Sequence, residues 1–347
     1  MSSFVRRPCV SLELAGQLAK KFYNFERINE IKELNSYSDR NFYVQGQRSN
    51  SYNTTQENET DSYEQGEYVL KILNSADSEH GDFIDAENEA MTFLRERELP
   101  CPSLFPVAGS GGSMKLLVQI PLCNDGASSV QEDVNKNVST TDHEWCVIRL
   151  ISFLLGVTAE SFGKFSCGNL FNIGQFVGRL SKSFQEFQCP VLHRKSDRWS
   201  IENFLSLESY VTSVDGEENK SLVREVLDRF ASHVTPKISL LRRGAIHNDV
   251  NKGNLLIDTS SDEFKISGLI DFGDMHFSCL LFELATNIAA FINDDDVLAV
   301  SGYLIAGYQA VFPLPGLEFE LLHEAVSARL CQVFPHCVKT SKGTNRK

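Results

Sequence analysis

The first part of the chain changes between helical and strand-like spacing of its hydrophobic residues. In residues 12–25, Leu and Phe recur every three or four positions, which predicts an amphipathic helix. Residues 31–44 alternate apolar and polar side chains around a polar turn at 35–41, which predicts a β-hairpin, and residues 67–73 predict the next strand. Residues 45–66 are almost entirely polar. We expect a mobile hairpin tip there, because so few apolar side chains cannot offset the entropy of ordering.

One more helix and two more strands complete this part. Residues 85–98 place apolar side chains on one face and charges on the other, which predicts a helix that ends before Pro100. Residues 114–120 and 145–153 predict strands, and the polar segment 123–143 between them predicts a surface loop. After the leading helix, the first part is therefore expected to contain five strands and one further helix.

After Gly156 the spacing becomes helical. Long helices are predicted at residues 170–187, 201–211 and 222–241. Residues 245–274 interrupt them with short β-type runs separated by polar turns. Residues 279–292 are strongly apolar but fall short of the ~20 residues that a membrane-spanning helix needs, so a buried helix is predicted.

These patterns predict an α+β fold with two lobes. Residues 1–152 would form an N-terminal, nucleotide-binding lobe built on an antiparallel sheet with one helix, and residues 153–156 a hinge. Residues 157–347 would form a mainly helical C-terminal lobe that contains the polar β-hairpin. Nucleotide-dependent phosphotransferases have this layout, which by itself is an analogy.

Charge and cysteine content narrow the classes of partner. The 347-residue chain has 46 acidic and 33 basic residues, a net charge of −13, which argues against binding to nucleic acid or to an anionic membrane. The N-terminal residues lack the apolar run of a secretory signal. The nine cysteines have the spacing of neither a zinc site nor a disulfide framework. We therefore expect a cytoplasmic protein with reduced thiols.

The candidate chemistry lies in two acidic turns. Residues 247–254 carry His247, Asp249 and, five residues further on, Asn254, and the second turn begins with Asp271 at the end of an apolar run. Phosphoryl transfer needs a carboxylate to orient the attacking hydroxyl and oxygen ligands to hold Mg²⁺ on the phosphates. We assign Asp249 as the catalytic base, with Asn254 and Asp271 as metal ligands.

Either turn alone is weak evidence. A His-x-Asp triplet is common and an Asp-Phe-Gly triplet is a frequent turn, so each by itself is more often structural. Their combination, with the Asn at a fixed spacing and roughly twenty residues of hairpin before the second turn, residues 271–274, is far more specific. His247 is expected to organise this catalytic hairpin by hydrogen bonding rather than to take a proton from substrate or to bind metal.

These residues resemble the signature of the aminoglycoside phosphotransferase and choline kinase branch of the protein-kinase-like fold. The turn at residues 36–42 and the stretch 271–275 are similar to segments of that family, and the likeness extends over residues 33–332. The resemblance implies transfer of the γ-phosphate of GTP or ATP, with Mg²⁺, to the side-chain hydroxyl of 5-hydroxy-L-lysine. Homoserine, choline or ethanolamine as acceptor, or a catalytically silent truncated isoform, are the alternatives.

The resemblance also implies roles for residues of the first lobe. Lys71 resembles the lysine that neutralises the nucleotide phosphates, with an ordinary solvated lysine as the alternative. Glu87, on the following helix, matches the ion-pair partner of that lysine, and Glu89 competes for this role. No glycine-rich loop exists, so Ser36 and Ser38 are expected to cap the phosphates with their hydroxyls and amides.

Two further positions follow from the resemblance, together with two departures from it. The Ser152 carbonyl and the Leu154 amide are expected to bind the edge of the nucleotide base. Asn248 stands where the family commonly has Gly, and Asn is the non-Gly residue that best tolerates positive φ. The likeness ends after Gln332, from which we expect a shortened C-terminus.

Three residues are candidates for binding a cationic amino-acid acceptor. Asp274 suits an ammonium group, and a solvated turn residue is an equally good interpretation. Glu283 lies in an apolar helix and needs a partner; we favour a brace to the backbone of the catalytic turn over recognition of a substrate ammonium. Arg329 is a candidate for the substrate carboxylate, against the alternative of a surface charge.

Overall fold

The computed structural model divides into two compact units. It describes residues 6–49, 63–122, 143–194, 199–261, 263–292 and 296–344, with side chains as far as Phe334. The first unit comprises residues 1–88 and 102–153, and the second unit comprises residues 89–101 and 154–347. Each unit is described by itself below.

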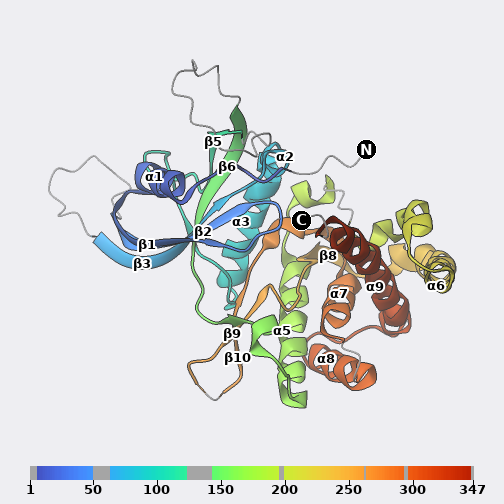
Figure 1. The fold of residues 1–347 in the computed structure, drawn as a ribbon. Helices are drawn as coiled ribbons and strands as arrows, with labels where there is room; N and C mark the ends of the chain where they lie inside the picture. Colours follow the sequence, from blue (N-terminus) through green and yellow to red (C-terminus); the bar gives the residue numbers. More distant parts are fainter. Residues whose placement is uncertain are drawn as a thin grey trace. The chain divides into compact units, whose positions relative to one another are not determined.

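An antiparallel sheet of six strands forms the first unit (Figure 1). Its strands are β1 (Phe25–Leu34), β2 (Arg40–Ser49), β3 (Tyr63–Ile72), β4 (Leu104–Phe105), β5 (Leu116–Pro121) and β6 (His143–Ser152). Their order is β1-β2-β3-β6-β4, and β5 pairs with β6. The two-residue strand β4 is the one that the hydrophobic pattern does not predict.

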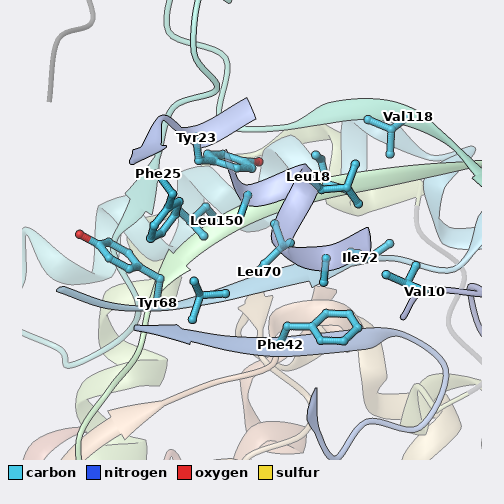
Figure 2. Close-up of a cluster of buried hydrophobic side chains, with 14 of the residues drawn as sticks. Val10, Leu18, Tyr23, Phe25, Phe42, Tyr68, Leu70, Ile72, Val118 and Leu150 are labelled. Carbon is cyan, nitrogen blue, oxygen red and sulfur yellow. The ribbon is translucent and has the colours of Figure 1, made fainter. Parts of the chain in front are cut away.

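Helix α1 (Leu12–Tyr23) supplies the apolar layer on one face of this sheet. The Ser11 hydroxyl accepts a hydrogen bond from the Leu14 amide and begins the helix. Figure 2 shows Leu18 and Tyr23 together with Leu70 of β3 and Leu150 of β6 in one buried cluster. Because side chains alternate along a strand, the residues on either side of Leu70 face the opposite surface of the sheet.

Two helices follow β3, α2 (Ser75–Ser78) and α3 (Gly81–Arg95). Helix α3 begins and ends earlier than the predicted 85–98, because Ile84 is already buried and the helix closes at its C-terminal end before Leu99. Glu98 has φ 60°, and the Leu99 amide donates to the Leu94 carbonyl oxygen, a common helix C-terminal closure. The boundary between the two units falls within this helix.

The polar segment 45–66, predicted as a mobile loop, is in part strand. Strands β2 and β3 stay paired from Gln45 opposite Glu67 to Ser49 opposite Tyr63. Backbone hydrogen bonds between the two strands stabilise this part of the hairpin. The buried guanidinium of Arg48 adds a contact with aromatic rings of the core. Residues 50–62, and residues 123–142 of the second predicted loop, lie outside the described residues.

Helices dominate the second unit. They are α4 (Ala159–Phe162), α5 (Cys167–Glu186), α6 (Glu217–Arg229), α7 (Leu280–Phe291), α8 (Val297–Val311) and α9 (Gly316–Thr344). Helix α7 is buried almost throughout, as residues 279–292 predicted. In Figure 1, α5, α7, α8 and α9 lie side by side. Helices α5 and α8 can approach closely because Gly174 has no Cβ. A Cβ at this position would overlap the Leu304 carbonyl oxygen.

Two predicted helices have a different form. Residues 201–211 lie in a 3₁₀ helix, Ile201–Ser213, rather than an α-helix. The predicted helix 222–241 is α6 followed by a π turn, Phe230–Val234, and a 3₁₀ turn, Thr235–Leu240. Pro236 explains the change, because it has no amide hydrogen and its ring would clash with the carbonyl four residues earlier in a regular α-helix.

Short strands of the second unit frame the two acidic turns. They are β7 (Val157–Thr158), β8 (Arg243–Ile246), β9 (Leu255–Asp258), β10 (Lys265–Leu269) and β11 (His276–Cys279). Strand β9 pairs with β10 and β7, and β8 pairs with β11. One turn therefore joins β8 to β9 and the other joins β10 to β11. Strands β7 and β11 were not predicted.

Two further observations concern membrane-spanning helices and the cysteines. In the described residues no helix is long and apolar enough to cross a membrane. Cys101, Cys146, Cys167, Cys189, Cys279 and Cys331 are free thiols. Cys9 is disulfide-bonded, so the expectation of reduced thiols is wrong for this residue.

Candidate active site

The turn between β8 and β9 holds the Asp249 carboxylate by both of its oxygens. The side-chain amide of Asn251 donates to Oδ1 at 2.7 Å, and that of Asn254 donates to Oδ2 at 2.6 Å. Asn254 also donates to the Asp249 carbonyl oxygen at 2.9 Å. Two asparagines within five residues of Asp249 thus fix the direction of its carboxylate, which is what a base that must meet a hydroxyl in one orientation requires.

Helix α7 braces this turn from the buried side. The carboxylate of Glu283 accepts hydrogen bonds from the His247 amide at 2.5 Å and the Asn248 amide at 3.2 Å. One turn of helix later, the Asn287 side chain donates to the Val250 carbonyl oxygen at 3.0 Å. Glu283 is completely buried, and burial raises its pKa to about 7 despite both amide donors. Its position favours the brace over recognition of a substrate ammonium.

His247 connects the two acidic turns. Its buried ring accepts a hydrogen bond from the Asp249 amide at Nδ1, 3.3 Å away, so Nε2 carries the proton and donates to the Ile270 carbonyl oxygen at 3.2 Å. The ring also meets the Phe272 ring edge-to-face, with centroids 4.7 Å apart. Both nitrogens are therefore used inside the protein, which agrees with an organising role for this histidine.

The second turn is brought beside the first by the β9–β10 ladder. The Ile270 amide donates to the Asn254 carbonyl oxygen at 3.0 Å, which places Asp271 next to Asn254. Asp271 is exposed and has φ 63°, in the left-handed region. Asn248 in the first turn has φ 65°, as expected from its replacement of a glycine. The two turns predicted from the sequence therefore converge.

Asn254 and Asp271 have the chemistry of ligands for a hard divalent cation. The amide nitrogen of Asn254 makes both of its side-chain hydrogen bonds, which leaves its carbonyl oxygen for a metal. Asp271 offers an exposed carboxylate. Among the described residues, no group of three or more His, Cys, Asp or Glu side chains could hold a metal. Two oxygen ligands fit Mg²⁺, which takes its other ligands from water and substrate phosphates.

Electrostatics set Asp249 apart from an ordinary surface carboxylate. The pKa of Asp249 is raised to about 6, mainly by burial and to a smaller extent by the neighbouring charge of Asp271. The Arg329 guanidinium, 3.9 Å from Oδ1, and the amides of Asn251 and Asn254 act in the opposite direction. A base with a pKa near the working pH is well suited to proton transfer.

Arg329 of α9 is buried and contacts the first turn, so it is not a surface charge. Its guanidinium donates to the Trp199 carbonyl oxygen at 2.9 Å and to the Asn248 carbonyl oxygen at 3.3 Å. Asp274 lies in a short 3₁₀ turn, is partly exposed, and accepts a hydrogen bond from His276 Nδ1 at its carbonyl oxygen. Acceptor binding by Arg329 and by Asp274 stays a prediction.

In the first unit the ion pairs differ from those that the resemblance implied. Lys71 pairs with Asp39, with Nζ 3.4 Å from Oδ2. Glu87 accepts instead from Arg149 of β6 at 2.7 Å, and Arg149 also donates to Asn88 at 3.0 Å. Arg149 lies opposite Lys71 in the β3–β6 register, and its forked guanidinium reaches both α3 side chains. The pairing of Glu87 with Lys71 is therefore corrected.

Sequence reasoning assigned no role to Asp39 or Arg149, and a signal existed for the second. Arg149 interrupts the apolar run 147–151, and a charge within a buried strand requires a buried partner. Asp39 lies in the turn 36–42 that resembles the family, where only the two serines were assigned a role. The competing candidate Glu89 is exposed.

The remaining predicted nucleotide contacts lie in or next to the first unit. Ser36 and Ser38 are partly buried in the turn between β1 and β2. Ser152 ends β6, and its hydroxyl accepts a hydrogen bond from the Ser103 amide at 2.8 Å. Leu154 is the first residue after the boundary of the first unit. Their contacts with a nucleotide stay predictions.

Comparisons with known proteins agree on the kind of enzyme. Residues 30–318 match the model of the phosphotransferase enzyme family. Hydroxylysine kinase from Danio rerio is 30% identical over 339 residues, covering 96% of this chain and 84% of that protein. Homoserine kinase from Methylobacillus glycogenes is 25% identical over 254 residues, covering 72% of this chain and 65% of that protein.

A solved structure provides the corresponding evidence for the fold. Amicoumacin kinase in complex with AMP-PNP, Ca²⁺ and Ami has a TM-score of 0.61 and 13% identity, covering 94% of this chain and 85% of that one. The likeness confirms the α+β, protein-kinase-like fold expected from the sequence.

Proposed function

Because this chain belongs to the phosphotransferase enzyme family, we propose that it transfers the γ-phosphate of GTP or ATP to the side-chain hydroxyl of 5-hydroxy-L-lysine. Membership of the family makes the chain an enzyme with a nucleotide co-substrate and a small-molecule acceptor. The acceptor comes from the hydroxylysine kinase relative, which aligns with nearly the whole chain. The observation that carries the proposal is the oriented Asp249 carboxylate beside Asn254 and Asp271.

Asp249 acts as the base in this proposal. Its carboxylate, fixed by Asn251 and Asn254, orients the acceptor hydroxyl and receives its proton as the oxygen attacks the γ-phosphorus. Burial favours this proton transfer because it raises the pKa of Asp249 to about 6, while Arg329 keeps the ionised form accessible. His247 and Glu283 hold the backbone of the turn and do not touch the reacting atoms.

Each unit contributes candidate residues for binding the nucleotide. The side-chain oxygen of Asn254 and the Asp271 carboxylate would hold Mg²⁺, which when bound neutralises charge on the phosphates. Lys71, with Ser36 and Ser38, would bind the phosphates. The backbone of Ser152 and Leu154 would bind the edge of the base, a contact that leaves GTP and ATP open as donors.

The acidity of the chain supports a cationic amino-acid acceptor. The net charge of −13 favours encounter with a cation over encounter with an anion. Asp274, partly exposed in the second turn, is the candidate partner for an acceptor ammonium. Homoserine is a second candidate acceptor, because a homoserine kinase aligns with this chain over 254 residues.

An acceptor panel tests the proposal. Release of GDP or ADP would be measured with 5-hydroxy-L-lysine, homoserine, choline, ethanolamine and an aminoglycoside, each with GTP and with ATP in the presence of Mg²⁺. L-Lysine is the matched control, because it has the same charges and lacks the hydroxyl. We expect the highest kcat/KM with 5-hydroxy-L-lysine and no stimulation by lysine.

Two results would contradict the proposal. Folded protein that turns over none of these acceptors would refute the activity and favour a catalytically silent chain. A kcat/KM at least about tenfold higher for homoserine than for 5-hydroxy-L-lysine would keep the reaction and replace the acceptor. Asp249→Asn protein, assayed in parallel, distinguishes turnover by this site from contaminating kinase activity.

A further inference from the structure

Two buried cations lie side by side on the face of the sheet opposite α1. Lys71 of β3 and Arg149 of β6 are directly opposite in the register, so their side chains point to the same face. Both are almost fully buried, at 7% and 2% exposure. Two like charges in this arrangement repel each other unless each has its own carboxylate, and each does.

The carboxylates come from different parts of the first unit. Glu87 of α3 pairs with Arg149, whose guanidinium also bonds to the neighbouring Asn88. Lys71 pairs with Asp39, the last residue of the turn that carries Ser36 and Ser38. The lysine is therefore tied to the turn between β1 and β2, and the helix glutamate is tied to an arginine.

Asp39 is itself fixed by contacts that do not involve Lys71. Its Oδ1 accepts hydrogen bonds from the backbone amide and the side-chain amide of Asn74, both at 3.0 Å. Asn74 is completely buried and caps α2 through the Asp77 amide. Ser78 of α2 in turn donates to the Asn74 carbonyl oxygen and accepts from the Val147 amide of β6. This network holds the Asp39 carboxylate in place from three elements.

One oxygen of Asp39 thus belongs to the network and the other faces the lysine ammonium. Because this carboxylate is itself fixed by Asn74, its ion pair with Lys71 sets the position of the lysine ammonium. A nearly buried ammonium also needs an opposite charge beside it, and the Asp39 carboxylate supplies one.

We propose that Asp39 is the positioning residue that holds Lys71 for the donor phosphates, in the place that the resemblance gave to Glu87. The inference rests on the proposed function, since it assumes that Lys71 binds the nucleotide. Asp39 acts through Lys71 and does not touch the nucleotide. It also couples the lysine to the turn of Ser36 and Ser38, so that the two phosphate-binding features are set in one geometry.

The two buried pairs provide a matched test. Asp39→Asn and Glu87→Gln each remove one carboxylate charge from a buried pair in the same unit, and the asparagine oxygen can still accept from Asn74. Each variant is combined with Lys71→Met. The dissociation constants for fluorescent GTP and ATP analogues are measured with Mg²⁺ and without acceptor, and melting temperatures report on folding.

We expect Asp39→Asn to weaken binding by at least about 10-fold in the wild-type background and by less than about 2-fold when Lys71 is already Met. Glu87→Gln should act independently of Lys71→Met, so that their separate effects on the dissociation constant multiply in the double variant. Two results would overturn the assignment. One is that the effects of Asp39→Asn and Lys71→Met multiply as independent changes, and the other is that Glu87 is coupled to Lys71 more strongly than Asp39 is. Lys71→Gln replaces Lys71→Met in the cycle if the double variant does not fold.

Donor binding separates this inference from the proposed reaction. If every acceptor fails while the nucleotides bind, the proposed function is refuted and the cycle still decides the role of Asp39. If wild-type protein binds neither nucleotide analogue, both proposals are overturned.

Discussion

The two acidic turns of the second unit are built in opposite ways. The first turn is anchored from the buried side: Glu283 holds two of its amides, and Arg329 holds the Asn248 carbonyl. The second turn begins with the exposed Asp271, which is positioned by the strand pair behind it and by its left-handed backbone. Both turns supply a carboxylate, yet that of Asp249 is partly buried and held by two asparagines, whereas Asp271 is exposed.

The difference fits the two chemical tasks proposed for these carboxylates. A base must meet one hydroxyl in one orientation, and enclosure fixes its direction and raises its pKa. A metal ligand must exchange its ion and nucleotide with solvent in every cycle, which an exposed carboxylate allows. Substitutions in the first turn should therefore change chemistry and stability, whereas those at Asp271 should change binding and leave stability almost unaltered.

The largest expected effect comes from removing the base. Asp249→Asn keeps the shape of the side chain and one acceptor oxygen but removes proton acceptance, so kcat should fall by about 10³-fold. The affinity for the nucleotide should change by less than about 3-fold, since the loss is confined to the reaction step. Steady-state kinetics and nucleotide binding measure the two quantities. Normal turnover by this variant would show that the first turn does not supply the base.

A second substitution tests the exposed turn. Asp271→Asn tolerates the left-handed backbone and removes the charge, so the apparent dissociation constant for the Mg²⁺–nucleotide complex should rise by about 10- to 100-fold. Unfolding free energy should stay within about 0.5 kcal/mol of wild type, as for other exposed positions. The comparison between the turns would break if this variant lost stability and kept its affinity for nucleotide.

The sequence predicted the elements whose signal is local. Alternation identified the long strands β2, β3 and β6, and continuous apolarity identified the buried helix α7. Strands β4 and β7 have two residues each, too few for any period to appear. The break in the helix at Phe230–Val234 arises from Pro236, which was visible in the sequence but was not weighed against the helical spacing around it.

Site residues followed the same division. Asp249, Asn254 and Asp271 could be proposed together from the sequence, because their spacing along the chain is itself the signal. The partner of Lys71 was missed because it depends on register: β3 places Lys71 opposite Arg149, and this competition assigns Glu87 to the arginine. No pattern along a single segment contains that information.

Glu283 tests how the first turn is braced. A glutamine in its place would have one oxygen for two amide donors, so Glu283→Gln should lower the unfolding free energy by about 2 kcal/mol at pH 5. The pKa of Glu283 is raised to about 7 in the folded protein, so the folded state retains a proton that the unfolded chain loses at lower pH. Its stabilising contribution is therefore full below the unfolded pKa and decreases as pH rises towards 7.

The deficit of the Gln variant should accordingly shrink between pH 5 and pH 8, and it should vanish or change sign by pH 8, because a shift of this size is worth up to about 3 kcal/mol. Urea unfolding of both proteins across this range measures it. A deficit that stays constant over this range would mean that the two amides hold Glu283 ionised, with a lowered pKa, and that burial is the weaker influence.

The smallest expected effect concerns the backbone of the same turn. Asn248 has φ 65°, and both polar atoms of its buried side chain have no hydrogen-bond partner among the described residues. Glycine removes the unsatisfied amide and accepts this φ without strain, so Asn248→Gly should be at least as stable as wild type. Asn248→Ala removes the same amide but places a Cβ at positive φ, and should be less stable than the Gly variant by about 1–2 kcal/mol.

Chemical unfolding of the two variants isolates the backbone contribution, because they differ only in that methyl group. Equal stability of the two would indicate that the first turn relaxes out of its left-handed geometry, and would weaken the contrast between a fixed first turn and an open second one.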